Sequence, residues 1–148
     1  MGMIFGRLAS LLAVALALSP PAFAADISAG KYRGSVGATA VIAFDVASGA
    51  VTNIHAGIMA MCQNTRARLT RKHVIAIRLG KKRVKISAGR AFAVKGRSDK
   101  NTSYILKGKF GASGKASGTF QASRIIFSPA TYSSELCQSR FPWKATLQ

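Results

Sequence analysis

The sequence predicts an all-β protein, an antiparallel β-sandwich or a closed β-barrel of roughly nine strands that carries one disulfide. Short apolar segments alternate with polar residues at a period of two, as side chains do on strands. Glycine-containing turns separate these segments. No segment after the first 24 residues shows a helical period longer than a turn or two. Many short strands with glycine-rich turns are typical of sandwiches and barrels.

Residues 1–24 have the features of a cleaved signal peptide. Arg7 precedes an apolar run, Leu8 to Leu18, that is too short to span a bilayer. Ala22-Phe23-Ala24 fits the small-x-small cleavage pattern, which predicts a mature chain from Ala25. An uncleaved anchor is disfavoured by the length of the run. We therefore expect a secreted or periplasmic bacterial protein, with no transmembrane segment after cleavage.

Cleavage would leave residues 25–148 as a single all-β domain. Removing 24 of 148 residues leaves 124, which is enough for one hydrophobic core. Of the 22 Lys and Arg only Arg7 is lost, while all 4 acidic residues remain, so the formal charge falls only from +18 to +17. This excess of positive charge predicts contact with an anionic partner.

The first half of the domain reads as short strands. Residues 31–36 form a first strand, and residues 40–46 pair as a hairpin with residues 51–54 across the Ser48-Gly49 turn. Residues 56–65 show no clear period and are predicted to be a connection. Residues 73–79 are almost wholly apolar, which predicts a strand covered on both faces.

Further strands are predicted at residues 83–88 and 91–95, with a loop over 96–102. Residues 104–110 and 115–120 alternate clearly, residues 125–127 form a short buried piece, and residues 143–147 form a last strand. Residues 128–142 are predicted to be the longest irregular segment. Gly108 and Gly118 interrupt strands and indicate bulges or close approaches. The aromatic rings are predicted to face inward at Tyr32, Tyr104, Phe110, Phe120 and Trp143, with Tyr132 and Phe141 exposed.

Cys62 and Cys137 are the two cysteines of the chain. In an oxidising compartment a single disulfide between them is the natural interpretation. No C-x-x-C motif is present for redox chemistry, and two cysteines without clustered histidines do not complete a zinc site. We therefore expect no metal and no cofactor.

Residues 66–97 contain many Lys and Arg and no acidic residue. On the predicted strands these cations recur at every second position and point away from the apolar side chains. If the strands are adjacent, the cations form one positive face. The alternative is an ordinary solvated surface in which charged edges prevent aggregation. The predicted anion-binding residues are Arg66, Arg68, Lys81, Lys82, Arg83, Lys85, Lys95 and Arg97.

No catalytic constellation is evident. His55 and His73 are the only histidines, and each stands alone in the sequence. Asp26, Asp45, Asp99 and Glu135 are scattered, so paired carboxylates would meet only by accident. The glycine-rich residues 111–118 lack the spacing and the following helix of a phosphate-binding loop. We therefore expect a protein that is not an enzyme.

The order of these motifs resembles a loose group of small exported bacterial all-β proteins with no assigned activity. The motifs that carry the resemblance are Gly30-Lys31-Tyr32-Arg33-Gly34, Phe44-x-Val46-x-x-Gly49-x-Val51, Cys62, Gly89-Arg90-Ala91-Phe92, Tyr104-x-Leu106-x-Gly108-x-Phe110, Gly114-x-Ala116-x-Gly118, Cys137 and Trp143-x-Ala145. The resemblance implies the all-β fold and the pairing of the cysteines. It implies no catalytic residue, and the uniform basic charge is not part of it.

Two functions fit these features. The first is a non-enzymatic exported β-domain that contacts anionic envelope material through a basic face; the partner would be lipopolysaccharide, teichoic acid, anionic lipid or extracellular nucleic acid. The alternative is a protein-binding, inhibitor-like module that acts through the loop at residues 128–142. An inhibitor of lysozyme is disfavoured, because lysozymes are usually basic and would repel this chain.

Overall fold

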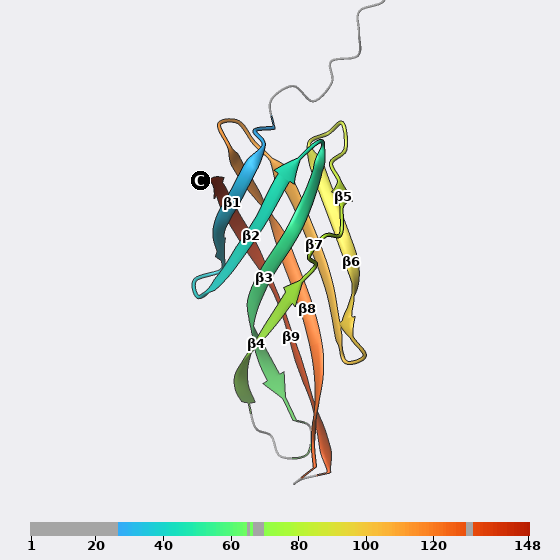
Figure 1. The fold of residues 1–148 in the computed structure, drawn as a ribbon. Helices are drawn as coiled ribbons and strands as arrows, with labels where there is room; N and C mark the ends of the chain where they lie inside the picture. Colours follow the sequence, from blue (N-terminus) through green and yellow to red (C-terminus); the bar gives the residue numbers. More distant parts are fainter. Residues whose placement is uncertain (1–26, 65, 67–69, 130–131) are drawn as a thin grey trace, which may run out of the picture.

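The computed structural model describes residues 27–64, 66, 70–129 and 132–148. In this part of the chain all regular structure is β, and every strand pairing is antiparallel. Figure 1 shows a tall, coiled sheet. The strands are β1 (Gly30–Val36), β2 (Ala40–Ala47), β3 (Ala50–Gln63), β4 (Thr70–Arg78), β5 (Val84–Lys85), β6 (Ala91–Asp99), β7 (Thr102–Phe110), β8 (Lys115–Ser128) and β9 (Ser133–Leu147). The predicted all-β class, nine strands and disulfide are confirmed.

The nine strands form one sheet in the order β4-β3-β2-β1-β9-β8-β7-β6, with β5 paired to β3. The sheet forks between β3 and β9. At one end these two strands pair directly through residues 61–63 and 136–138. Toward the other end β1 and β2 lie between them, because β1 pairs with both β2 and the C-terminal half of β9. The Cys62–Cys137 disulfide lies where β3 and β9 meet.

The coiled sheet encloses a core of aromatic rings. Tyr32 stacks on Phe44 with 5.2 Å between ring centroids, and the Phe110 ring meets Tyr32 edge-on at 5.5 Å. Trp143 lies 5.8 Å from Phe44 and donates a hydrogen bond from its indole nitrogen to the Lys107 carbonyl oxygen at 3.1 Å. These rings come from strands on opposite sides of the coil, so their packing joins its two halves. The predicted inward aromatics are all buried, and Tyr132 and Phe141 are exposed.

Two glycines allow the strands around this core to approach closely. A Cβ atom at Gly34 would lie 1.7 Å from the Lys144 carbonyl oxygen, and one at Gly118 would lie 1.9 Å from the Lys107 carbonyl oxygen. Gly108 pairs with Gly118, and a Cβ atom at Gly108 would overlap the rings of Phe92 and Trp143. The predicted close approaches at Gly108 and Gly118 are therefore present.

Two segments that were predicted to be irregular are strands. Residues 56–63 continue β3, and alternate residues there are buried: Ala56, Ile58, Ala60 and Cys62. Small side chains hid this period. Most of residues 128–142 belongs to the β8–β9 hairpin, whose inward side chains include Ser133 and Glu135, while Leu136 is exposed. Polar residues inward and an apolar residue outward reverse the usual pattern, so the prediction of a loop was wrong.

Other details also differ from the prediction. The piece at residues 125–127 was predicted to be buried, but it lies within β8, and Ile125 and Phe127 are 50% and 58% exposed. β4 is not covered on both faces, because Val74 remains 50% exposed. Only Val84 and Lys85 form a strand where residues 83–88 were expected to. β6 extends to Asp99, so most of the predicted loop at 96–102 belongs to a tight hairpin with β7.

The predicted signal peptide, residues 1–24, lies outside the described residues. The part of the chain that is described holds no helix long and apolar enough to cross a membrane.

Candidate functional site

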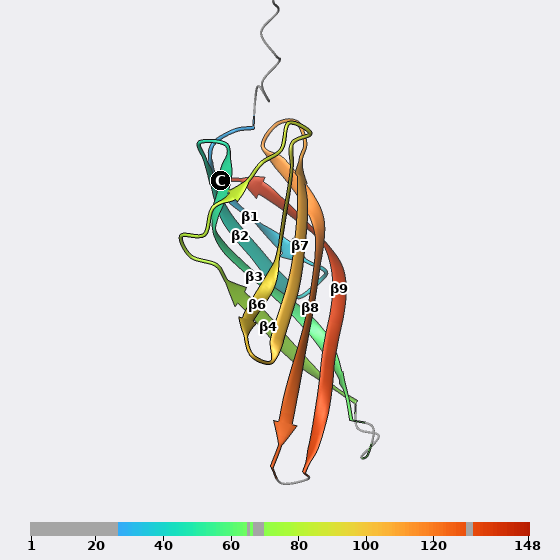
Figure 2. The same ribbon diagram turned by 90° about the vertical axis from the view of Figure 1, so that its right-hand side faces the viewer.

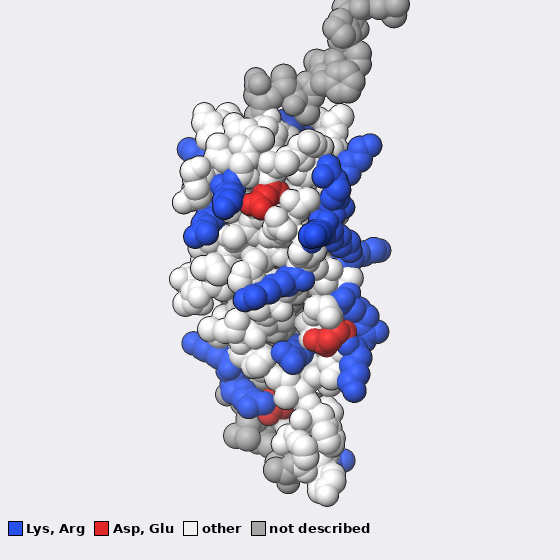
Figure 3. Space-filling model, viewed as in Figure 1, with Lys and Arg blue, Asp and Glu red and all other residues white. Residues whose placement is uncertain are grey.

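The predicted anion-binding residues occupy three places in the fold. Lys81, Lys82, Arg83 and Lys85 are exposed on β5 and the connection before it, and Lys95 and Arg97 are exposed on β6. Arg66 follows the end of β3 that lies farthest from β5 in Figure 1. Arg68 lies outside the described residues. Figure 3 shows Lys and Arg densest along the margin beside β5 and β6, with separate groups elsewhere on the same view.

A set of seven cations lies on the outer surface of β6 to β9, which faces away from the aromatic core. Along β7 and β9, buried and exposed residues alternate, so that the cations point outward. We call these residues the outer basic face: Lys95, Arg97, Lys107, Lys109, Lys115, Arg140 and Lys144. Every one of them is exposed.

The strand register places these cations near one another. Lys109 and Lys144 both flank Ser117, on the neighbouring strands β7 and β9. At about 5 Å between strands, their backbones are about 10 Å apart. Lys107 and Lys109 are separated by about 7 Å along β7. Cations at these spacings repel one another, which favours the binding of a polymer or surface with several negative charges.

The outward positions of β7, β8 and β9 include no acidic residue. Glu135 faces inward and accepts a hydrogen bond from Arg71 Nε at 2.6 Å. Asp45, on β2, accepts a hydrogen bond from Asn53 at 2.7 Å. Asp99 ends β6, and the backbone N–H of Asn101 holds the pKa of its carboxyl below the ordinary value. The charge of the outer basic face is therefore not neutralised from within β7 to β9.

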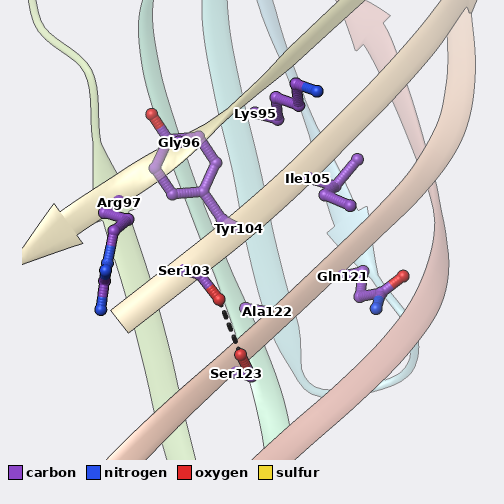
Figure 4. A pocket seen from close by; sticks show the side chains of 9 residues that line it. All are labelled: Lys95, Gly96, Arg97, Ser103, Tyr104, Ile105, Gln121, Ala122 and Ser123. Carbon is purple, nitrogen blue, oxygen red and sulfur yellow. Dashed lines mark hydrogen bonds between the residues drawn. The ribbon is translucent and has the colours of Figure 1, made fainter. Parts of the chain in front are cut away.

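Hydroxyl and amide groups lie between the cations. An open hollow of about 460 Å³ lies on β6, β7 and β8, with Ile105 among its lining residues and Lys95 and Arg97 on one side. Figure 4 shows Gln121 on the other side, and the hydroxyls of Ser103 and Ser123 hydrogen-bonded at 2.8 Å. The hollow thus offers cations, hydroxyls and an amide to an anionic or hydroxylated group.

Two further hollows lie on β8 and β9. One, of about 430 Å³, includes Lys115 and Lys144 in its lining, and the other, of about 400 Å³, includes Gln121 and Arg140. Together with the hollow on β6 to β8 they follow the outer basic face along its length. The same surface therefore combines positive charge with a series of open hollows.

Sequence reasoning missed five members of the outer basic face: Lys107, Lys109, Lys115, Arg140 and Lys144. Lys107 and Lys109 alternate with buried residues in a strand that was predicted correctly, so their outward direction was readable. Arg140 fell in a segment taken as irregular. What the sequence could not supply is the order β9-β8-β7-β6, which places these strands beside one another.

The two histidines of the chain point in different directions. His55 pairs with Arg78 and lies between the inward positions Ile54 and Ala56, so it points outward. His73 shares the inward side of β4 with Ile75, and its Nε2 atom is buried without a hydrogen-bond partner among the described residues. The two histidines thus occupy opposite faces of the sheet. A carboxylate oxygen of Glu135 lies within 4.8 Å of both cysteine sulfurs, which the disulfide already uses.

No family model, no curated protein and no solved structure matches this chain.

Proposed function

We propose that this protein binds a phosphate-bearing polyanion, without catalysis, through the outer basic face. The observation that supports the proposal is the run of cations on β6 to β9, with no acidic residue at the outward positions of β7, β8 and β9. The shared chemistry of lipopolysaccharide, teichoic acid, anionic lipid and extracellular nucleic acid is a dense array of phosphates. An exported protein would meet any of them outside the cytoplasm.

Binding by this surface is electrostatic and supplemented by hydrogen bonds. Lys and Arg displace the counterions of the polyanion, so affinity falls steeply as salt rises. Ser and Gln side chains between the cations donate hydrogen bonds to phosphate or hydroxyl oxygens. The outward positions of β7 and of β8 up to Ser123 carry no aromatic ring, so base stacking does not contribute there. We therefore expect little discrimination between polyanions of equal charge density.

The test compares two variants that lose the same charge from different faces. In the outer-face variant Lys107, Lys109, Arg140 and Lys144 are replaced by Gln. In the matched control the replaced residues are Lys31, Arg66, Lys72 and Arg78, which are all exposed and lie on β1, on β4 or just after β3. Retention on immobilised polyphosphate is measured in a salt gradient. The outer-face variant should elute at clearly lower salt than the control; equal elution would contradict the proposal.

A third variant tests the cations that precede and form β5. Replacing Lys81, Lys82, Arg83 and Lys85 by Gln removes four exposed cations from β5 and the connection before it. If the polyanion lies along β7 to β9, this variant elutes between the control and the outer-face variant. If this variant alone lost retention, the binding site would be assigned to β5 and the connection before it.

A further inference from the structure

The end of the β8–β9 hairpin projects beyond the rest of the sheet. The pairing of β8 with β7 ends at Arg124, and the pairing of β9 with β3 ends at Leu136. The Ile125 N–H still donates a hydrogen bond to the Asn101 carbonyl oxygen at 3.0 Å. Past that contact, among the described residues, β8 and β9 pair only with each other, through Ser128 and Ser133. Figure 2 shows this two-stranded ribbon extending past the turn between β6 and β7. Past Ile125, the described part of the ribbon pairs along neither outer edge, and it has two faces.

The inner face of the ribbon packs Ile126 against the core and is held in place by polar contacts. The Ser133 hydroxyl accepts a hydrogen bond from Asn64 at 2.8 Å. Glu135 is buried and paired with Arg71 at 2.6 Å. Both contacts join the ribbon to the end of β3 and the start of β4. The orientation of the ribbon is thus fixed, and its other face is turned to solvent.

The outer face of the ribbon exposes large apolar side chains. Ile125 and Leu136 are directly paired across the two strands and are 50% and 45% exposed. Phe127 follows on the same face at 58%, and Tyr132, between the two strands, is 81% exposed. The core does not use these side chains. Large apolar side chains grouped in water mark a surface that another molecule covers.

The same side of β8 and β9 carries both this apolar end and the outer basic face. Outward positions run along β9 from Leu136 to Arg140 and Lys144. Cations beside an exposed apolar and aromatic group are the combination that binds an anionic bilayer, with Lys and Arg on the phosphates and the apolar side chains at the acyl boundary. Tyr suits this interfacial depth, because its ring is apolar and its hydroxyl is polar. A second copy fits less well, because each chain has a formal charge of +18, and copies repel one another.

We propose that the β8–β9 ribbon inserts Ile125, Phe127, Tyr132 and Leu136 into the headgroup region of an anionic lipid bilayer. This inference rests on the proposed function for its electrostatic part and names a lipid surface as the polyanion. The ribbon lies in the surface layer and does not cross the membrane.

The test measures binding to vesicles of phosphatidylcholine with and without phosphatidylglycerol. Because residues 8–18 are themselves apolar, the assay uses the chain from Ala25, which contains every strand that the structure describes and both cysteines. The ribbon variant carries Ile125→Ser and Phe127→Ser. Its matched control, Val41→Ser with Val74→Ser, changes exposed apolar residues on β2 and β4. We expect the ribbon variant to lose at least about tenfold in affinity for the anionic vesicles, and the control to change little.

A fluorescence measurement locates the ribbon directly. Phe127→Trp adds a second tryptophan to the chain, and the native Trp143 is 1% exposed and shielded from lipid. Brominated phosphatidylglycerol should quench the new emission and leave that of the parent chain unchanged. Absence of quenching with bound protein would overturn insertion.

Soluble polyphosphate separates the two proposals. If the ribbon variant keeps its affinity for polyphosphate but binds vesicles more weakly, both proposals stand. If the ribbon variant binds vesicles as the parent chain does, insertion is wrong and the proposed function stands. If the parent chain binds neither ligand, the proposed function fails. A dimer that the ribbon substitutions dissociate would assign the apolar face to a second copy instead.

Discussion

Cys62 and Cys137 face each other directly across β3 and β9, with Cα atoms 3.9 Å apart, although 75 positions separate them in the chain. The disulfide lies at the fork of the sheet, where β3 and β9 pair before β1 and β2 come between them. It therefore joins the β1–β4 part of the sheet to the β6–β9 part that carries the outer basic face.

Replacing both cysteines by Ala should destabilise the protein strongly. A closed loop of this length restricts the unfolded chain enough to contribute about 4–5 kcal/mol as an upper value. Urea unfolding of the parent chain, of the reduced parent chain and of the double variant measures the loss. We expect the reduced chain and the variant to agree; a loss under about 1 kcal/mol would mean that strand pairing alone holds the fork.

Gly118→Ala should be far more damaging than Gly57→Ala. A Cβ at Gly118 would lie 1.9 Å from the Lys107 carbonyl oxygen, so β7 and β8 would have to separate. The nearest atom to a Cβ at Gly57 is 3.9 Å away, which is ordinary contact. We expect a loss of about 2–4 kcal/mol for Gly118→Ala and little or no loss for Gly57→Ala, measured by thermal or denaturant unfolding. Equal losses would refute the close approach.

Tyr104 should make the protein less stable at alkaline pH. Burial raises the pKa of its phenol above the ordinary value of 10.0, and burial likewise raises that of Tyr32. The unfolded chain therefore ionises first, so this stability is fully present below about pH 10 and is lost as the pH rises through the folded-state pKa. Tyr104→Phe removes this contribution. Between pH 9 and 11, the free energy of unfolding of the Tyr104→Phe variant should fall less steeply than that of the parent chain.

Removing Arg71 should destabilise the protein more than removing its ion-pair partner Glu135. The Arg71 side chain is 55% exposed and the Glu135 side chain 9%. Removing Glu135 leaves a cation that water hydrates, whereas removing Arg71 leaves a buried carboxylate without its partner. We expect Arg71→Met to cost about 1–3 kcal/mol and Glu135→Gln less. The reverse order in urea unfolding would contradict the burial of Glu135.

Periodicity in the sequence was sufficient to predict a strand where large apolar residues alternate with polar ones. The strand that contains Tyr104, Leu106 and Phe110 was predicted almost to its ends. Prediction failed where the inward residues are small, as in residues 56–63, or polar, as with Ser133 and Glu135. In those strands the buried side chains are set by the disulfide, an ion pair and close packing, which a pattern of hydrophobicity does not detect.

The candidate site was predictable only in part. The excess of positive charge and the outward direction of Lys107 and Lys109 follow from the sequence. Their position beside Arg140 and Lys144 does not, because it depends on the pairing of β8 with both β7 and β9. The sequence directed attention to the continuous basic stretch, of which Lys95 and Arg97 belong to the outer basic face.

Lysine acetylation in the presence and absence of polyphosphate tests the central claim most directly. Mass spectrometry of the modified chain gives the protection of each lysine. We expect the bound polymer to protect Lys95, Lys107, Lys109, Lys115 and Lys144, while Lys31 and Lys72 are modified at an unchanged rate. Equal protection of all exposed lysines, or protection confined to Lys31 and Lys72, would contradict it.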